Sequence, residues 1–348
     1  MTIKRSQFPK ISLSLLLVVP FVSLIVGTVG LVGYLSYQSG QEAVKKIANQ
    51  LMVNTGKQVN QELNLYLQTA HETNQRHIAA INAGVINLEN IDQLHRYLIL
   101  QHRQSQILTT FLFGSPQGDF RVSHRVNPSD FGITTLLQTG ELPFEIGVSK
   151  PQNPATNRIY SVDESGNLAR LLTAIENIDV RDRHWYRQAV KNGKTGWSQP
   201  FQVGSTSLLA LNAYAPFYDK SQQLLGVFSV NISLNQLGDF LRGLKVGQTG
   251  GIYIMDRNGL LIANSTTESS YFVSGKQDLS GTAKTGTIEF KRLSANQLSN
   301  SAIQNSYNYL KESLKDNLVT LRSPQTLDVW ISGKRYFLNI DSYQDNNS

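Results

Sequence analysis

Residues 181–201 read RDRHWYRQAVKNGKTGWSQPF, and they place two of the chain's three tryptophans beside several arginines. A packed core would hold the rings without the guanidinium groups, and a solvated helix would hold the charges without the rings. A ligand pocket uses both, because guanidinium groups bind carboxylates or phosphates and aromatic rings supply contact area. The stretch therefore indicates a ligand site. It also predicts a helix that Asp179 or Asp182 caps and that runs through Asn192 to the glycines of KNGKTG.

Apolar runs separated by turn residues surround this helix and predict three β-hairpins, which turn at residues 115–119, 164–167 and 219–222. In the return strand of the third hairpin, VFSVNIS, apolar and polar residues alternate. Neighbouring side chains of a strand point to opposite faces of a sheet. We therefore expect Phe228, Val230 and Ile232 on one face, and the alternate set on the other: Val227, Ser229, Asn231 and Ser233.

A second group of elements begins at residue 234. Residues 234–244, LNQLGDFLRGL, have the apolar spacing of a helix. The sequence then predicts a tight hairpin turning at 257–259, a strand GTIEFKRL, a helix NSAIQNSYNYLKESL and a last hairpin turning at 332–334. The fold class is therefore α+β, with two α+β units joined by a short helix.

The N-terminus has the pattern of a membrane anchor. MTIKRSQFPK carries three cations and no acid, and the run from Ile11 to Tyr37 has no charged side chain. About 20 apolar residues are enough for a helix to cross the hydrocarbon core. The positive-inside rule places residues 1–10 in the cytoplasm and the bulk of the chain outside it. The chain would then be a single-pass protein of the inner (plasma) membrane, with its main part on the periplasmic side. A cleaved signal peptide is the alternative.

After the anchor, residues 38–84 predict a long exposed helix that ends at Gly84. Apolar residues recur there at helical spacing, with polar residues between them, as in GKQVNQELNLYLQ. The narrow apolar seam suits packing against the chain's own domain or against a second copy in a homodimer, and the sequence does not choose between them. A further helix is predicted over about 90–104.

Composition excludes several kinds of function. The chain has no cysteine, which rules out disulfides and cysteine-ligated metals. Its net charge of +7 is scattered, so nucleic acid is not an expected partner. The six histidines are dispersed without metal-ligand spacing, and no nucleophile or phosphate-binding motif occurs. We expect no cofactor, no metal and no catalytic residues.

These segments together resemble the double Cache (tandem PAS-like) sensor domain. RDRHWYRQAV, GWSQPF, LLGVFSVNISLNQLGDFL and LKVGQTGGIYIMDRNGLLIANS occur in the order seen in that family, and the resemblance covers about 40–348. It is strongest to extracytoplasmic sensors of bacterial, including cyanobacterial, histidine kinases, nucleotide cyclases and chemoreceptors. The resemblance implies two PAS-like antiparallel sheets in tandem. The membrane-distal, ligand-binding unit would be 85–233, and 234–348 would hold the linker helix and the membrane-proximal unit.

The resemblance also implies a ligand site. In the amino-acid-binding branch of the family, an Arg-x-Trp-Tyr group holds the ligand carboxylate, and Arg183, Trp185 and Tyr186 match it. A Tyr and an Asp after the next proline, and an Asp on the last strand, would hold the ammonium. This sequence departs there, with Phe201, Val203 and Asn231 in their places, and Ile178 stands at a position that is often Tyr.

The departures predict the class of ligand. A buried ammonium needs a compensating negative charge, and both acids are missing. The guanidinium fork still suits a carboxylate. We therefore expect an anionic or neutral small molecule rather than an α-amino acid.

Simpler structural roles stay open for the same residues. Arg183 can pair with Asp179 or Asp182 at the surface, which would contribute about 0–1 kcal/mol. Trp185 can belong to the core, Trp197 is expected to be a packing residue, and His184 is expected to be exposed.

The sequence thus predicts the small-molecule sensor of a transmembrane receptor and no enzymatic activity in this chain. No second apolar run returns to the membrane, so we expect either a fragment that lacks its output domain, such as a kinase, a cyclase or a chemotaxis module, or a stand-alone sensor with a separate partner. The alternatives are a membrane-anchored hydrolase outside the cell and a structural envelope protein.

Overall fold

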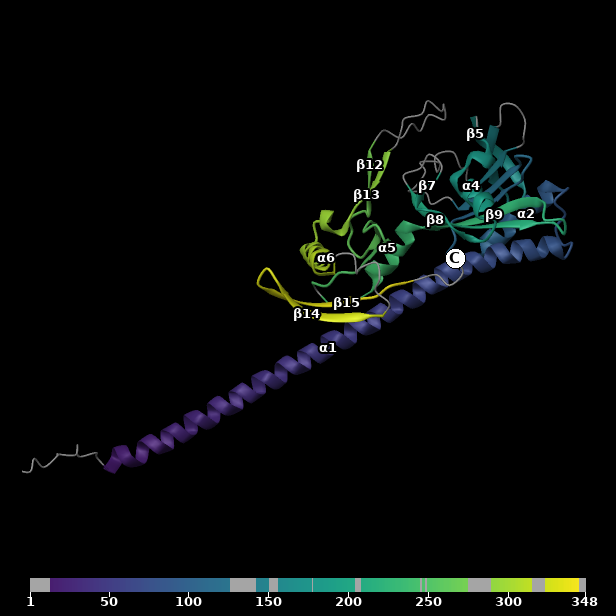
Figure 1. Cartoon of the computed structure of the whole chain (residues 1–348). Coiled ribbons are helices and arrows are strands. Elements are labelled where there is room, and N and C mark those ends of the chain that lie inside the picture. Colours follow the sequence, from purple (N-terminus) through teal and green to yellow (C-terminus); the bar gives the residue numbers. More distant parts are fainter. Residues whose placement is uncertain are drawn as a thin grey trace, which may run out of the picture. The chain divides into compact units, whose positions relative to one another are not determined.

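The computed structural model describes residues 13–125, 142–149, 156–176, 178–203, 208–244, 246–247, 249–274, 289–314 and 323–343. The chain divides into two compact units, Met1–Asn54 and Thr55–Ser348. Helices and antiparallel sheets both contribute, which confirms the α+β class (Figure 1). The predicted boundary at residue 234 lies inside the second unit and stays a prediction.

Helix α1 (Leu13–Asn82) contains the predicted anchor and the predicted exposed helix in one run of 70 residues. Pro20 lies in the helix interior, where proline normally costs a hydrogen bond. The helix ends just before Gly84, whose φ of +73° suits glycine, as predicted. Among the described residues, α1 is the helix long and apolar enough to cross a membrane. The predicted cytoplasmic residues 1–10 lie outside the described part.

The centre of the second unit is an antiparallel sheet with the strand order β5-β4-β3-β2-β1-β9-β8-β6, and β7 also pairs with β8. All three predicted hairpins are present. Strand β3 was not predicted, because its partners are β2 and β4 and no turn signal marks it as a hairpin arm. The strands are β1 (Thr110–Gly114), β2 (Phe120–Arg125), β3 (Leu142–Ser149), β4 (Thr156–Val162), β5 (Leu168–Glu176), β6 (Gly196–Trp197), β7 (Phe201–Gln202), β8 (Leu209–Tyr218) and β9 (Leu224–Ser233).

Helices cover both faces of this sheet (Figure 1). The C-terminal part of α1 and helix α2 (Ile91–Gln104) pack on the face that carries Phe111, Phe228 and Val230. Helix α4 (His184–Asn192) and the short 3-10 helix η2 (Val180–Asp182) pack on the opposite face, against Leu112 and Val227. The predicted alternation along β9 is confirmed, and both of its faces are buried.

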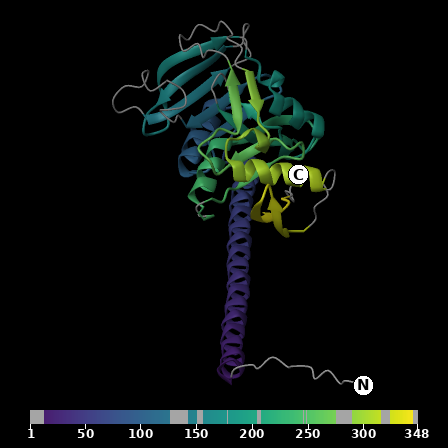
Figure 2. The ribbon, with the colours of Figure 1, turned by 90° about the vertical axis from the view of Figure 1, so that its left-hand side faces the viewer.

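Beyond the sheet, helix α5 (Leu234–Gly243) leads to three two-stranded sheets, β10-β11, β12-β13 and β14-β15, so the strands described there do not form one sheet. Bonds such as the Leu261 N–H to the Leu293 carbonyl, 2.7 Å, link the first two pairs. Figure 2 shows the last hairpin, in yellow, beside helix α6. These elements are β10 (Tyr253–Met255), β11 (Leu261–Asn264), β12 (Tyr271–Ser274), β13 (Glu289–Arg292), the 3-10 helix η3 (Ala295–Gln297), α6 (Ser301–Leu314), β14 (Gln325–Ile331) and β15 (Lys334–Ile340).

Candidate functional site

Helix α4 begins one residue after Arg183, which occupies the N-cap position with extended backbone and no side-chain cap. The predicted aspartate cap is therefore wrong for this helix. Asp179 instead caps η2, where its carboxylate accepts from the Arg181 N–H at 2.9 Å. The extended backbone at Arg183 separates the two helices, so a cap on the first cannot serve the second. The predicted end is confirmed, because Gly193 terminates α4 with a φ of +66°.

The two arginines of this segment differ in their partners. Arg181 is exposed and holds the Asp179 carboxylate with two nitrogens, at 3.0 and 2.5 Å. Arg183 is half-buried, and within the described ranges its guanidinium has no ion pair or hydrogen bond. Burial lowers the pKa of Arg183. The surface pair that the sequence left open for Arg183 is thus made by Arg181.

Trp185 and Tyr186 are core residues, only 2% and 5% exposed. Their rings meet edge to face with centroids 5.8 Å apart, and Trp185 also lies 6.4 Å from the ring of Phe120. A Cβ on Gly114 would come within 3.0 Å of the Tyr186 ring, so glycine lets that ring reach the sheet. Burial raises the pKa of Tyr186. The core role that the sequence left open for Trp185 is confirmed, and a ligand contact for either ring stays a prediction.

On the sheet face that α4 packs against, four adjacent strands carry a row of buried polar side chains. The strand register aligns His124 of β2, Thr110 of β1, Asn231 of β9 and Asn212 of β8. Thr110 Oγ1 lies 2.7 Å from His124 Nδ1, and the Asn212 amide donates to Asn231 Oδ1 at 2.6 Å. Asn212 Oδ1 is buried and accepts no hydrogen bond from the described residues. Burial lowers the pKa of His124 to about 4, so the row is uncharged near neutral pH.

Sequence reasoning found Asn231 and missed the rest of this row. Thr110, His124 and Asn212 are far apart in the chain, and only the strand pairing aligns them. The alternation of polar and apolar residues was the available signal, but it does not give the register between strands.

Phe201 and Val203 lie at the sheet edge, where Phe201 of β7 pairs with Ala210 of β8. Both are half-buried. Val203 lines a cavity of about 660 Å³, whereas the other five predicted site residues do not. The structure therefore places Asn231 on the face that α4 covers, but it does not gather all six residues around one cavity.

The remaining site expectations concern the neighbouring aromatic and histidine residues. Trp197 meets the ring of His71 edge to face at 5.1 Å, which confirms it as a packing residue. His184 is exposed, as expected. Among the residues described, no group of three histidines and acids is arranged to hold a metal ion.

Comparison with known proteins places this arrangement in a family. The Cache domain model matches residues 36–331, which is most of the chain. The chain belongs to the Cache domain family. The double Cache resemblance inferred from the Arg-x-Trp-Tyr motif is confirmed.

Individual proteins resemble this Cache domain at low sequence identity. The methyl-accepting chemotaxis protein McpA of Bacillus subtilis is 25% identical over 126 residues, which are 35% of this chain and only 18% of McpA. The ligand-binding domain of the Pseudomonas aeruginosa amino acid chemoreceptor PctC, solved with GABA, is 16% identical. The match covers 84% of this chain and 90% of the PctC domain, with a TM-score of 0.44. The ligand-binding domain of the Campylobacter jejuni chemoreceptor Tlp3, solved with 4-methylisoleucine, is 11% identical. The match covers 63% of this chain and 71% of the Tlp3 domain, with a TM-score of 0.36.

Proposed function

We propose that this Cache domain is the small-molecule sensor of a membrane receptor and binds a small carboxylate between α4 and the large sheet. The observation that carries the proposal is Arg183. Its guanidinium is half-buried, burial disfavours its charged form, and no acid of the described residues neutralises it. A desolvated charge without a counterion is costly, and a bound carboxylate would supply the missing charge through two parallel N–H···O bonds.

The groups proposed to face Arg183 favour an anion over a zwitterion. The positions that would hold an ammonium are Phe201, Val203 and Asn231, and none of them carries a negative charge. Asn231 also uses its carbonyl oxygen to accept from Asn212. An ammonium would have to lose its water without gaining a counterion, so we expect α-amino acids to bind much more weakly than their deaminated analogues.

A bound ligand would bias α1 through the sheet. On the face opposite the proposed site, the buried Asn74 of α1 donates to the carbonyl of Ala213 in β8 at 2.9 Å. Ala213 follows Asn212, a member of the polar row. A ligand that shifted β8 would therefore change a contact of α1. It would do so by binding more tightly to one of two arrangements of β8 and α1, and so increasing the population of that arrangement. We infer that α1 anchors a single-pass receptor with this domain outside the cell, as a homodimer whose output lies in another domain.

The proposal is tested by calorimetric titration of the full chain in nanodiscs. Lactate and succinate are the anionic probes, and alanine, which is lactate with an ammonium in place of the hydroxyl, is the matched zwitterion. We expect saturable binding of at least one carboxylate and at least tenfold weaker binding of alanine.

Micromolar binding of alanine would contradict the proposed ligand class. A chain that bound none of these probes, and showed no thermal stabilisation with any of a wider set of organic acids, would contradict the carboxylate site itself.

A further inference from the structure

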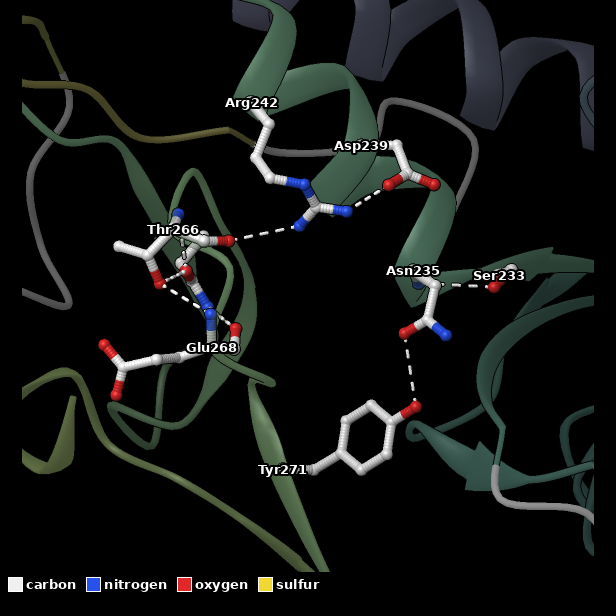
Figure 3. A network of polar contacts seen from close by, with 8 residues as sticks. Ser233, Asn235, Asp239, Arg242, Thr266, Glu268 and Tyr271 are labelled. Carbon is white, nitrogen blue, oxygen red and sulfur yellow. Dashed lines mark hydrogen bonds and ion pairs between the residues drawn. The ribbon is translucent and has the colours of Figure 1, made fainter. Parts of the chain in front are cut away.

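The cavity of about 660 Å³ lies between α5 and the loop that joins β11 to β12, and its walls also include ends of β1, β2 and β8. This volume falls within the range of about 300–1,000 Å³ typical of small-molecule sites. Part of the wall is apolar, formed by Leu209, Leu234 and Ile262. Polar side chains of the wall come from α5 and from the loop (Figure 3), and Thr109, His124 and Arg125 add others at the strand ends.

Hydrogen bonds fix the loop side of the cavity in place. Asn264 donates to the Glu268 carbonyl and to Ser270 Oγ, at 3.1 and 3.0 Å, and accepts from Thr266 N–H at 2.8 Å. The Glu268 carboxylate is held by the N–H and hydroxyl of Ser299, at 2.9 and 2.8 Å. In Figure 3 this carboxylate points away from Asn235 and Asp239. The loop therefore offers a preformed wall rather than a charged group.

The charged side chains of the cavity lining already have partners. Arg125 donates to the His102 carbonyl at 3.2 Å, and the Glu268 carboxylate accepts from Ser299. Arg242 holds Asp239 and donates to the Thr266 carbonyl at 3.1 Å. A charged ligand would have to compete with these contacts, whereas a neutral ligand would leave them in place.

Hydrogen-bonding capacity remains on the α5 side. Gln236 Oε1 is buried and accepts no hydrogen bond in the described part of the chain. Asn235 accepts from the Tyr271 hydroxyl at 3.2 Å, but its NH₂ group donates to no described residue. The side chains of these two adjacent residues both line the cavity, as do the apolar side chains of its wall. A hydroxyl group can serve either the acceptor or the donor, because it both donates and accepts.

We propose that this cavity binds a neutral polyhydroxylated molecule, a monosaccharide or cyclic polyol, with hydroxyls on Asn235 and Gln236 and the C–H face of its ring on Leu209 and Ile262. Val203 and His124 border this cavity as well as the surroundings of the carboxylate site, but Asn235 and Gln236 are not among the residues proposed to hold the carboxylate. The cavity joins the large sheet to α5 and the β11-β12 loop, so its occupation would stabilise the packing between them.

The test is calorimetric titration of the full chain in nanodiscs with D-glucose and with myo-inositol. At least one should bind saturably. Asn235→Ala and Gln236→Leu should each weaken that binding about threefold to tenfold, the effect of one lost neutral hydrogen bond. Asn258→Ala, an exposed asparagine in the β10-β11 turn, is the matched control and should bind as the unmodified chain does.

Titration of the same samples with succinate keeps the two sites distinguishable. Arg183→Ala should leave polyol binding unchanged, and the α5 variants should leave succinate binding unchanged. The absence of binding by both polyols, or undiminished binding in both α5 variants, would overturn the proposal. A Gln236→Leu chain that folds serves as the test if Asn235→Ala does not fold.

Discussion

The two faces of the nine-stranded sheet are covered by helices of different chemistry. The face beneath α1 and α2 is filled with rings, and Phe113, Phe217 and Phe228 form one cluster there. The face beneath α4 carries the uncharged polar row, and Arg183 is the N-cap residue of the helix that packs on it. The first face also buries a guanidinium, that of Arg121, but this group lies 3.8 Å from the Asp92 carboxylate and donates to the Phe120 carbonyl. The second face is covered by a helix whose N-cap cation, Arg183, has no acidic partner among the described residues.

Histidines sharpen this contrast, because the ring-filled face buries several of them in neutral form. His77 lies among the rings of Tyr97, Phe111 and Phe228, with centroids 5.6, 5.2 and 5.2 Å away, and neither ring nitrogen makes a hydrogen bond to a described residue. Desolvation, with the nearby charge of Arg76, lowers its pKa to about 3. His102 stacks on the Phe111 ring, with centroids 4.5 Å apart.

The largest predicted effect is acid destabilisation of the domain. Burial lowers the pKa of His77 and His102 to about 3 and that of His95 and His124 to about 4. The unfolded chain therefore binds protons below pH 6.5 that the folded chain does not, and the free energy of unfolding falls as pH falls. The loss is on the order of 2 kcal/mol per histidine at pH 5. Urea unfolding between pH 7.5 and 5 measures it.

A matched pair of variants assigns this effect to burial. His77→Phe keeps a ring in the aromatic cluster and should reduce the pH dependence, whereas His184→Phe replaces an exposed histidine and should not. Stability that stays constant between pH 7.5 and 5 in the unmodified chain would contradict the burial of these histidines in neutral form.

The next largest effect is expected from a substitution that creates a cavity in the ring-filled face. Phe228 is fully buried and contacts the rings of Phe113 and Phe217, at 5.1 and 5.3 Å. Phe228→Ala should lower the free energy of unfolding by about 3–5 kcal/mol, through lost burial and the cavity left behind. Phe272→Ala, in an exposed position, should change it by less than about 0.5 kcal/mol. Similar losses for the two variants in denaturant unfolding would show that the described core is misplaced.

The other face should respond in binding rather than in stability. Arg183→Ala should weaken carboxylate binding by about 1.5–3 kcal/mol, because a charge-assisted bond is lost. Arg181→Ala is the matched control, since its guanidinium already holds Asp179. Calorimetry of both variants separates a ligand contact from a general effect of positive charge. Equal losses in the two variants would argue against a direct role for Arg183.

The smallest predicted effect follows from adding a negative charge to the neutral polar row. Asn231→Asp is nearly isosteric and can still accept from Asn212. The new carboxylate should weaken binding of succinate by about 1–2 kcal/mol through repulsion and should narrow the preference for lactate over alanine. Asn231→Leu would remove the hydrogen bond without adding a charge. If it weakened succinate binding as much as Asn231→Asp did, repulsion would not be the cause.

Most of the fold was predictable, because its signals are local. Turn residues located the hairpins, apolar spacing located α2, α5 and α6, and glycines marked the ends of α1 and α4. Strand β3 lacked such a signal. The aspartate cap was assigned to the wrong helix because the extended backbone at Arg183 depends on packing and not on residue type.

The site was predictable only in part. The family motif pointed to Arg183, Trp185 and Tyr186, but it did not indicate that both rings are core residues. Dispersed histidines gave no hint of a common environment, since α1, α2 and the sheet bring them together only in three dimensions. For the same reason the partners of Asn231, and the cavity beside α5, required the strand register and the packing of distant segments.

The central claim is that Arg183 holds an anion over the polar row, and a crystal structure of the domain with a bound carboxylate tests it most directly. The account predicts the carboxylate on two nitrogens of the Arg183 guanidinium, between α4 and the strands β1 and β9. A carboxylate bound elsewhere, with Arg183 paired to an acidic side chain of the chain itself, would contradict it.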